Sequence, residues 1–189
     1  ANFTGVPASM FEDLLQFSHD FQVARTERRH ANLHHDKNHG APRHVTVLTY
    51  LTEVVLGGGG HTIFPALPTS QQPRPDWNHT FHEIFRGAFV GVKPGDQWPA
   101  VQVEDSNPMA EALSAACDEV NRNSLAHFAV RPLPGRSVVF WHEDSHGNAL
   151  PEQFHAGCPV LQGEKISLQK FKNFAPDHPQ CRRSWYCGL

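Results

Sequence analysis

The stretch that decides the fold is Phe154-His155-Ala156-Gly157-Cys158-Pro159-Val160-Leu161-Gln162-Gly163-Glu164-Lys165. It is apolar and β-prone, and its glycines and proline predict a strand, a bend and a second strand. The second strand continues through 166–171, where apolar and polar residues alternate as in a half-buried strand. His155 and Lys165 can therefore point into one cavity, where a histidine can hold a metal and a lysine can neutralise an acid.

A second group of ligand-type residues lies upstream, at Leu33-His34-His35-Asp36. Because side chains on a strand alternate between faces, His34 and Asp36 share a face and His35 points away. Together with His155 they make two imidazoles and one carboxylate, the facial triad of non-haem Fe(II) oxygenases. A β-bulge here would instead bring His35 beside Asp36, and this alternative stays open. His-x-Asp alone is a weak signal among 14 histidines.

Further motifs follow the first half of the triad in chain order: Tyr50-Leu51, Gly59-Gly60-His61-Thr62-Ile63-Phe64-Pro65, Gly135-Arg136-Ser137-Val138-Val139-Phe140-Trp141, and the stretch from His155 to Lys165. In the order of these motifs and in their residues, the sequence resembles the prolyl 4-hydroxylases from about residue 22 to 174. The resemblance implies a mainly β (α+β) fold, a double-stranded β-helix (jelly roll) with flanking helices.

The resemblance also implies the chemistry. It predicts an Fe(II)- and 2-oxoglutarate-dependent dioxygenase that hydroxylates peptidyl proline at C4, releases succinate and CO2, and uses ascorbate as reductant. By the same resemblance, the metal ligands are His34, Asp36 and His155. Lys165 completes the catalytic set by pairing with the far carboxylate of 2-oxoglutarate, which Tyr50 and Thr62 hydrogen-bond.

Three rival functions remain. The same chemistry can act on another peptide side chain or a small molecule, because the family's upstream Arg-x-Ser substrate motif has no counterpart and Ile166 replaces a frequent aromatic. A catalytically silent jelly roll that binds a peptide is a second possibility. A zinc hydrolase is a third, but the sequence nominates no general base for it.

Length and composition set the frame. The 189 residues suit a single catalytic domain, 1–189. A hydrophobic content of 39%, a charged content of 19% and a net charge of −3 are those of a soluble globular protein and argue against nucleic acid as a partner. No apolar run approaches the roughly 20 residues of a membrane span. The expected partner is a proline-containing peptide or protein, and the sequence does not fix the oligomeric state.

Residues 66–127 look like an insertion that family members lack. We expect it to pack as an outer layer, with a lid over the site as the alternative. Within it, Asn107-Pro108 predicts the start of a helix. Its apolar side would comprise Met109, Leu113, Ala116, Cys117 and Val120.

Local patterns predict the remaining elements. A capping box at Ser9 and an apolar face through Phe17 predict a first helix, and 21–25 reads as a strand. Further strands are expected at 44–54, 61–65, 127–131 and 137–142, with a turn at 57–60. The acidic and histidine residues of the loop before His155 are interpreted as solvated rather than as a second metal site: His142, Glu143, Asp144 and His146.

The four cysteines and the chain start bear on the compartment. In collagen-type relatives the motif cysteine pairs with one past the last strand, which implies Cys158 with Cys181 here; four free thiols are the alternative. Two glycosylation sequons, at Asn2 and Asn78, lean towards a secretory route such as the endoplasmic reticulum lumen. The chain begins at Ala1 and shows no signal-peptide core, so we expect a processed or trimmed product of undetermined compartment.

Overall fold

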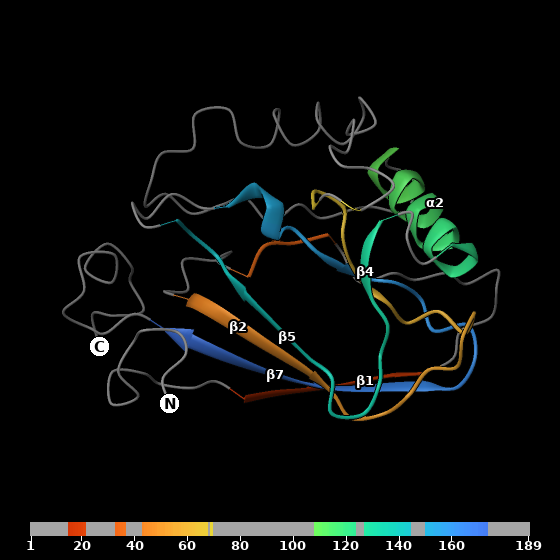
Figure 1. Cartoon of the computed structure of the whole chain (residues 1–189), viewed down its shortest axis with the longest axis horizontal. Coiled ribbons are helices and arrows are strands. Elements are labelled where there is room, and N and C mark those ends of the chain that lie inside the picture. The colour runs from red at the N-terminus through yellow and green to blue at the C-terminus, as the bar shows by residue number, and fades with distance from the viewer. Residues whose placement is uncertain are drawn as a thin grey trace.

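The computed structural model describes residues 15–21, 33–36, 43–67, 69, 108–123, 127–144 and 150–173. These residues form two β-sheets with one α-helix beside them (Figure 1). The elements are β1 (Leu15–Phe21), β2 (Arg43–Tyr50), β3 (Thr62–Phe64), α2 (Pro108–Arg122), β4 (Phe128–Val130), β5 (Ser137–Trp141), the 3-10 turn η3 (Pro151–Gln153), β6 (Ala156–Gly157) and β7 (Glu164–Asn173). Every strand predicted from β2 onward is therefore present, although the strand predicted over 44–54 ends at Tyr50. No helix in these ranges is long and apolar enough to span a membrane.

The first sheet is antiparallel and has the order β1-β7-β2-β5; its strands run side by side in Figure 1. The second has the order β4-β3-β6 and is also antiparallel. Segment 33–36 adds to the second sheet next to β6, because the backbones of His34 and His155 exchange two hydrogen bonds of 3.0 Å.

The connectivity of these eight segments is that of a jelly roll. In chain order, the first, third, sixth and eighth segments belong to the first sheet, and the others to the second. Successive segments thus pass repeatedly between two facing antiparallel sheets, as in double-sheet jelly rolls. The predicted mainly β fold and its double-stranded β-helix architecture are confirmed.

Helix α2 covers the outer face of the second sheet. Its buried residues recur at helical spacing and pack with residues of the segment 33–36 and of β3 and β6 in one apolar cluster: Leu33, Ile63, Ala110, Leu113, Ala116, Cys117, Val120, Phe154, Ala156 and Cys158. The helix predicted from Pro108 is therefore confirmed, and it packs as an outer layer. Residues 70–107 lie outside the described part of the chain, so the extent of the insertion stays a prediction.

The glycine-rich turn lets two chain segments approach closely. Gly59 has a positive φ of 80°, and a Cβ there would lie 2.1 Å from the carbonyl oxygen of Pro159. That oxygen accepts a hydrogen bond of 2.8 Å from the amide of Gly60. Only glycine fits this approach, and the predicted turn before β3 is confirmed.

The prediction for the N-terminal region was wrong over residues 15–17. The expected helix reached Phe17, whereas Leu15–Phe21 is β1 and pairs along its whole length with β7. Leu15, Phe17 and Phe21 also fit a period of two, and the neighbouring strand supplies backbone partners that a local pattern cannot reveal. Residues 9–14 and 22–25 of the expected helix and strand lie outside the described residues.

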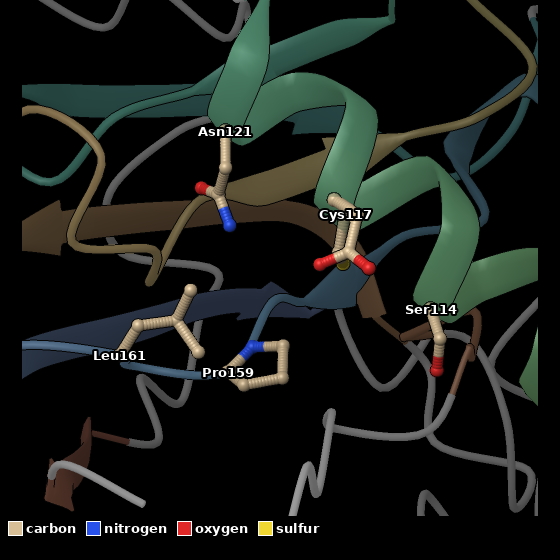
Figure 2. A pocket seen from close by; sticks show the side chains of 6 residues that line it. Ser114, Cys117, Asn121, Pro159 and Leu161 are labelled. Atoms are coloured by element: carbon tan, nitrogen blue, oxygen red, sulfur yellow. The ribbon is translucent and has the colours of Figure 1, made fainter. Parts of the chain in front are cut away.

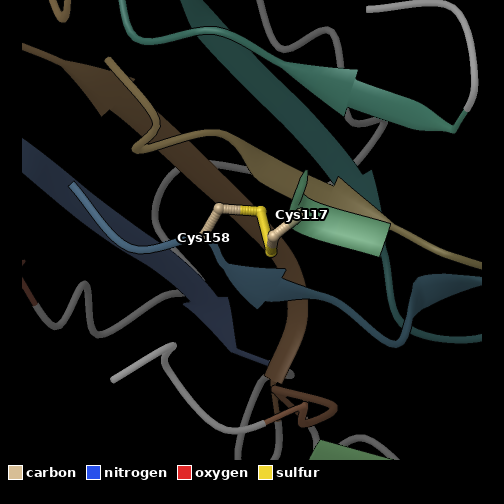
Figure 3. The surroundings of a disulfide bond; sticks show 2 residues. All are labelled: Cys117 and Cys158. Carbon is tan, nitrogen blue, oxygen red and sulfur yellow. A yellow bond between two sulfur atoms is a disulfide. The ribbon is translucent and has the colours of Figure 1, made fainter. Parts of the chain in front are cut away.

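The predicted pairing of Cys158 with Cys181 was also wrong, because Cys158 is bonded to Cys117 (Figure 3). Along β6 the side chain of His155 faces the interior, so that of Cys158 points outward. The outer face is where α2 packs, and Cys117 lies on the buried side of that helix. The disulfide therefore ties the helix to the strand that carries His155.

Candidate metal centre

Three of the predicted site residues meet between the two sheets. His34, Asp36 and His155 each offer a ligand atom, and these atoms all lie within 4.8 Å of one another. The antiparallel bridge between His34 and His155 places the two imidazoles side by side, with ring centroids 4.4 Å apart. Asp36 and His155 are each only 3% exposed, whereas the side chain of His34 is 38% exposed.

The carboxylate of Asp36 lies between the two imidazoles. Its Oδ1 is 3.4 Å from His34 Nε2, and its Oδ2 is 3.8 Å from His155 Nε2. His155 Nδ1 donates a hydrogen bond of 2.9 Å to the carbonyl of Gln153. Its Nε2 then carries the lone pair of the neutral ring, and this buried atom has no hydrogen-bond partner among the described residues. A buried lone pair beside a carboxylate and a second imidazole fits a divalent metal.

The protonation states suit metal binding. Burial would raise the pKa of Asp36, but the neighbouring His155, the hydrogen bond to His34 and the nearby His142 together hold it well below its usual value. Burial lowers the pKa of His155 to about 4, and the proximity of Asp36 only partly opposes this. At neutral pH the site therefore offers an ionised carboxylate and a neutral imidazole, which are the forms that bind metal.

His35 takes no part in this cluster, as strand alternation predicts. Its ring is fully buried on the other side of the segment, against Phe154 and His142, with ring centroids 5.2 and 5.3 Å away. Its Nε2 donates to the carbonyl of Leu150 at 3.2 Å. His35 thus lies on the side away from Asp36, so the geometry does not support the bulged alternative.

Two residues beside Asp36 were missed by the sequence reasoning. Thr46 Oγ1 donates a hydrogen bond of 2.6 Å to Asp36 Oδ2, and the same oxygen lies 2.8 Å from His142 Nε2. Both residues are fully buried. Thr46 shares its strand face with Leu48 and Tyr50, so the alternation in β2 was a signal that could have found it.

The interpretation of His142 and Glu143 as solvated loop residues was wrong. His142 is 0% exposed and Glu143 is 6% exposed. Glu143 pairs with His44 at 3.3 Å, and burial lowers the pKa of His142 well below its usual value. The end of β5 carries both residues into the protein, so their position differs from that of an exposed loop. His146 lies outside the described residues.

Tyr50 and Thr62 meet in the buried interior. The Tyr50 hydroxyl donates a hydrogen bond of 2.7 Å to Thr62 Oγ1, and both side chains are buried. Burial raises the pKa of Tyr50 to about 12, although the Thr62 hydrogen bond works against this. Tyr50 is therefore a neutral donor at physiological pH, and the hydroxyl proton of Thr62 remains to be donated elsewhere.

Lys165 lies on the same face of the first sheet as Tyr50. Tyr50 is the register partner of Ser167, so Ser167 and Lys165, two residues apart, share the inward face with Tyr50. The side chains of Lys165 and Ser167 are buried, with 6% and 3% exposure. A buried lysine on the same sheet face as two hydroxyl-bearing side chains is a suitable setting for an anionic group of a ligand.

Aromatic rings pack against His155. Phe64 stacks on the His155 ring with centroids 5.4 Å apart, and Phe140 packs edge-on against it at 4.9 Å. The two phenyl rings also contact each other at 5.2 Å. They fix the orientation of the imidazole and keep water from its flank.

A small pocket between α2 and the segment after β6 belongs to a different face (Figure 2). Its lining residues come from the helix and from 159–161: Ser114, Cys117, Asp118, Asn121, Pro159 and Leu161. It lies on the outer side of the second sheet, whereas the three ligand-type residues face the interior. We therefore assign it no part in the candidate metal centre.

With this geometry established, comparisons identify the family. The model of the 2OG-Fe(II) oxygenase superfamily matches residues 21–173, and the chain belongs to this superfamily. Membership implies Fe(II) as the metal and 2-oxoglutarate as the cosubstrate.

Individual relatives agree with the resemblance to prolyl 4-hydroxylases. The chain is 25% identical to prolyl 4-hydroxylase 5 of Arabidopsis thaliana over 174 residues, which cover 90% of this chain and 45% of that protein. It is 28% identical to prolyl 4-hydroxylase 2 of the same plant over 162 residues, or 80% and 40% of the two chains. It thus spans less than half the length of these relatives.

Among solved structures, the chain is similar to the viral collagen prolyl hydroxylase of Paramecium Bursaria Chlorella virus-1 in its 2OG complex. The TM-score is 0.47 and the sequence identity 17%, over 87% of this chain and 62% of that one.

Proposed function

We propose that this chain carries the catalytic centre of an Fe(II)- and 2-oxoglutarate-dependent dioxygenase that hydroxylates peptidyl proline at C4. Membership of the 2OG-Fe(II) oxygenase superfamily and the prolyl 4-hydroxylase relatives support this proposal. The observation that carries it is the cluster of His34, Asp36 and His155, in which a buried imidazole lone pair finds no hydrogen-bond partner in the part of the chain that the structure describes.

In this proposal those three residues hold the iron. Two imidazoles and one carboxylate leave coordination positions for a cosubstrate and for oxygen. Bound iron supplies redox chemistry, which zinc with its filled d shell cannot. Overall, one oxygen atom of O2 enters the C–H bond of the substrate and the other enters succinate, while 2-oxoglutarate loses CO2.

The far carboxylate of 2-oxoglutarate would be held by Lys165 and Thr62. Lys165 supplies the positive charge on a stem long enough to reach in from β7. Because Tyr50 donates its proton to Thr62, the Thr62 hydroxyl is left to donate to the carboxylate. In this proposal the metal-binding donors hold one end of the cosubstrate, and the buried cation with the hydroxyls holds the other.

The remaining roles follow from the same resemblance. A proline-containing peptide or protein is the proposed substrate, and ascorbate is the proposed reductant that keeps the iron ferrous. The aromatic flank of Phe64 and Phe140 excludes water beside His155, which limits unproductive side reactions.

Mass spectrometry of proline-rich peptides tests the proposal. The protein is incubated with Fe(II), 2-oxoglutarate, ascorbate and a peptide whose prolines carry deuterium at C4. We expect a gain of one oxygen atom with loss of one deuterium, and no product from the Asp36→Ala control.

The other outcomes are equally informative. Succinate without peptide hydroxylation would retain the chemistry and reject peptidyl proline in favour of another side chain or a small molecule. Neither product, from a folded protein that binds iron, would support a catalytically silent binding module.

A further inference from the structure

Behind Asp36 lies a short chain of buried polar groups that the proposed chemistry does not use. Thr46 Oγ1 is 2.6 Å from Asp36 Oδ2 and 2.8 Å from His142 Nε2. His142 Nε2 itself is 4.0 Å from that carboxylate oxygen. The three residues come from three segments, 33–36, β2 and the end of β5, so only the folded jelly roll brings them together.

The direction of the protons in this chain follows from its chemistry. An ionised carboxylate only accepts hydrogen bonds, so the single hydroxyl proton of Thr46 is committed to Asp36. The Thr46 oxygen can then only accept from His142, which must carry its proton on Nε2. His142 Nδ1 is the unprotonated atom, and within the described ranges it is buried without a hydrogen-bond partner.

The histidine ring is itself held in place by packing. Its centroid lies 5.3 Å from those of His35 and Phe140, both in edge-on contact. His142 is fully buried. Its Nε2 proton therefore points at Thr46 as a fixed donor.

We propose that His142 and Thr46 are positioning residues that fix the carboxylate of Asp36 for metal binding. In this relay His142 Nε2 donates to Thr46 Oγ1, and Thr46 Oγ1 donates to Asp36 Oδ2. The relay limits rotation of the carboxylate and holds it between the imidazoles of His34 and His155. This inference rests on the proposed metal centre. Outer hydrogen bonds of this kind typically contribute about 10–100-fold to metal affinity or activity.

Thr46→Val tests the relay, because valine keeps the shape of threonine and removes only the hydroxyl. Mn(II) serves as the probe, with its dissociation constant measured from the free-ion electron paramagnetic resonance signal. We expect Thr46→Val to weaken Mn(II) binding about 10–100-fold and Thr46→Ser to restore it. The matched control is Thr49→Val on the same strand, whose hydroxyl pairs with Ser137 at 2.8 Å, away from the site.

A spectroscopic measurement separates positioning from mere stability. Co(II) bound to wild-type protein and to Thr46→Ser should give the same visible absorption spectrum, and Thr46→Val a different one. His142→Phe, which retains a ring and lacks the donor, should weaken Mn(II) binding in the same direction, and His142→Gln, which keeps an N–H donor, should recover part of it.

The outcomes separate the relay from the metal centre. If wild-type protein binds no Mn(II), the proposed metal site fails. If wild type binds and Thr46→Val binds equally well, or loses no more than Thr49→Val, the relay is overturned. Should Thr46→Val not fold, wild-type affinity in His142→Phe overturns it.

Discussion

Breaking the disulfide between Cys117 and Cys158 should lower the free energy of unfolding, by an amount that depends on the length of the loop that the bond closes. The two cysteines are 41 residues apart in the chain. The chain-entropy relation for a closed loop of that length gives about 13 cal/mol/K, or about 4 kcal/mol at 25 °C. For a chain of this size, such a loss corresponds to a fall in melting temperature of about 8–16 °C.

A double-mutant cycle measures this contribution. Cys117→Ala, Cys158→Ala and the double variant are compared with wild type by urea unfolding of the metal-free protein. Because either single change breaks the same bond, each should cost about 4 kcal/mol and the double variant little more. Small additive losses would refute the reasoning, as would alkylation of both thiols in the native oxidised protein. Cys181→Ala should leave the Cys117–Cys158 peptide intact in a non-reducing digest.

Two further predictions concern Lys165 and His61. Lys165→Ala should weaken 2-oxoglutarate binding by roughly two to three decades, since removing one partner of a buried ion pair costs about 3–5 kcal/mol. The affinity for Mn(II) should stay unchanged. If turnover depends on the 2-oxoglutarate concentration as in wild type, Lys165 is not part of the site. For His61, burial and then the nearby charges of Arg131 and Lys165 lower the pKa to about 4. Because this folded-state pKa lies below the unfolded value, the unfolded chain takes up the proton first as the pH falls. The contribution of His61 to the free energy of unfolding is therefore fully present above pH ~6.5 and is lost as the pH falls towards ~4. His61→Gln should therefore flatten the pH dependence of the unfolding free energy, by up to about 1.4 kcal/mol per pH unit in that window; parallel curves for the two metal-free proteins would contradict this.

Much of the interior could be predicted from the sequence because it depends on a simple period. Alternation of side chains on a strand predicted that His34 lies on the side of Asp36 and that His35 points away, as the structure shows. The glycine turn was predictable for a similar reason, since positive φ angles select glycine locally.

Features that depend on packing between distant segments were not predictable in this way. The apolar face of α2 showed that the helix is buried, but not that the outer face of β6 is its partner, so the disulfide of Cys158 was assigned to the wrong cysteine. His142 stands beside acidic residues that suggest an exposed loop, and only the position of β5 carries it against Asp36. At the N-terminus, periods of 3.6 and 2 compete over Leu15–Phe17, and pairing with β7 decided between them.

The central claim is that His34, and not its neighbour His35, is a ligand of the iron. It is tested most directly by measuring succinate release from 2-oxoglutarate for a variant of each histidine. His34→Ala removes a proposed iron ligand, whereas His35→Gln keeps a donor for the Leu150 carbonyl outside the cluster. With both variants shown to be folded by circular dichroism, we predict that Fe(II)-dependent succinate release is abolished in His34→Ala and substantially retained in His35→Gln. An active His34→Ala beside an inactive His35→Gln would contradict the ligand assignment and the metal centre built on it.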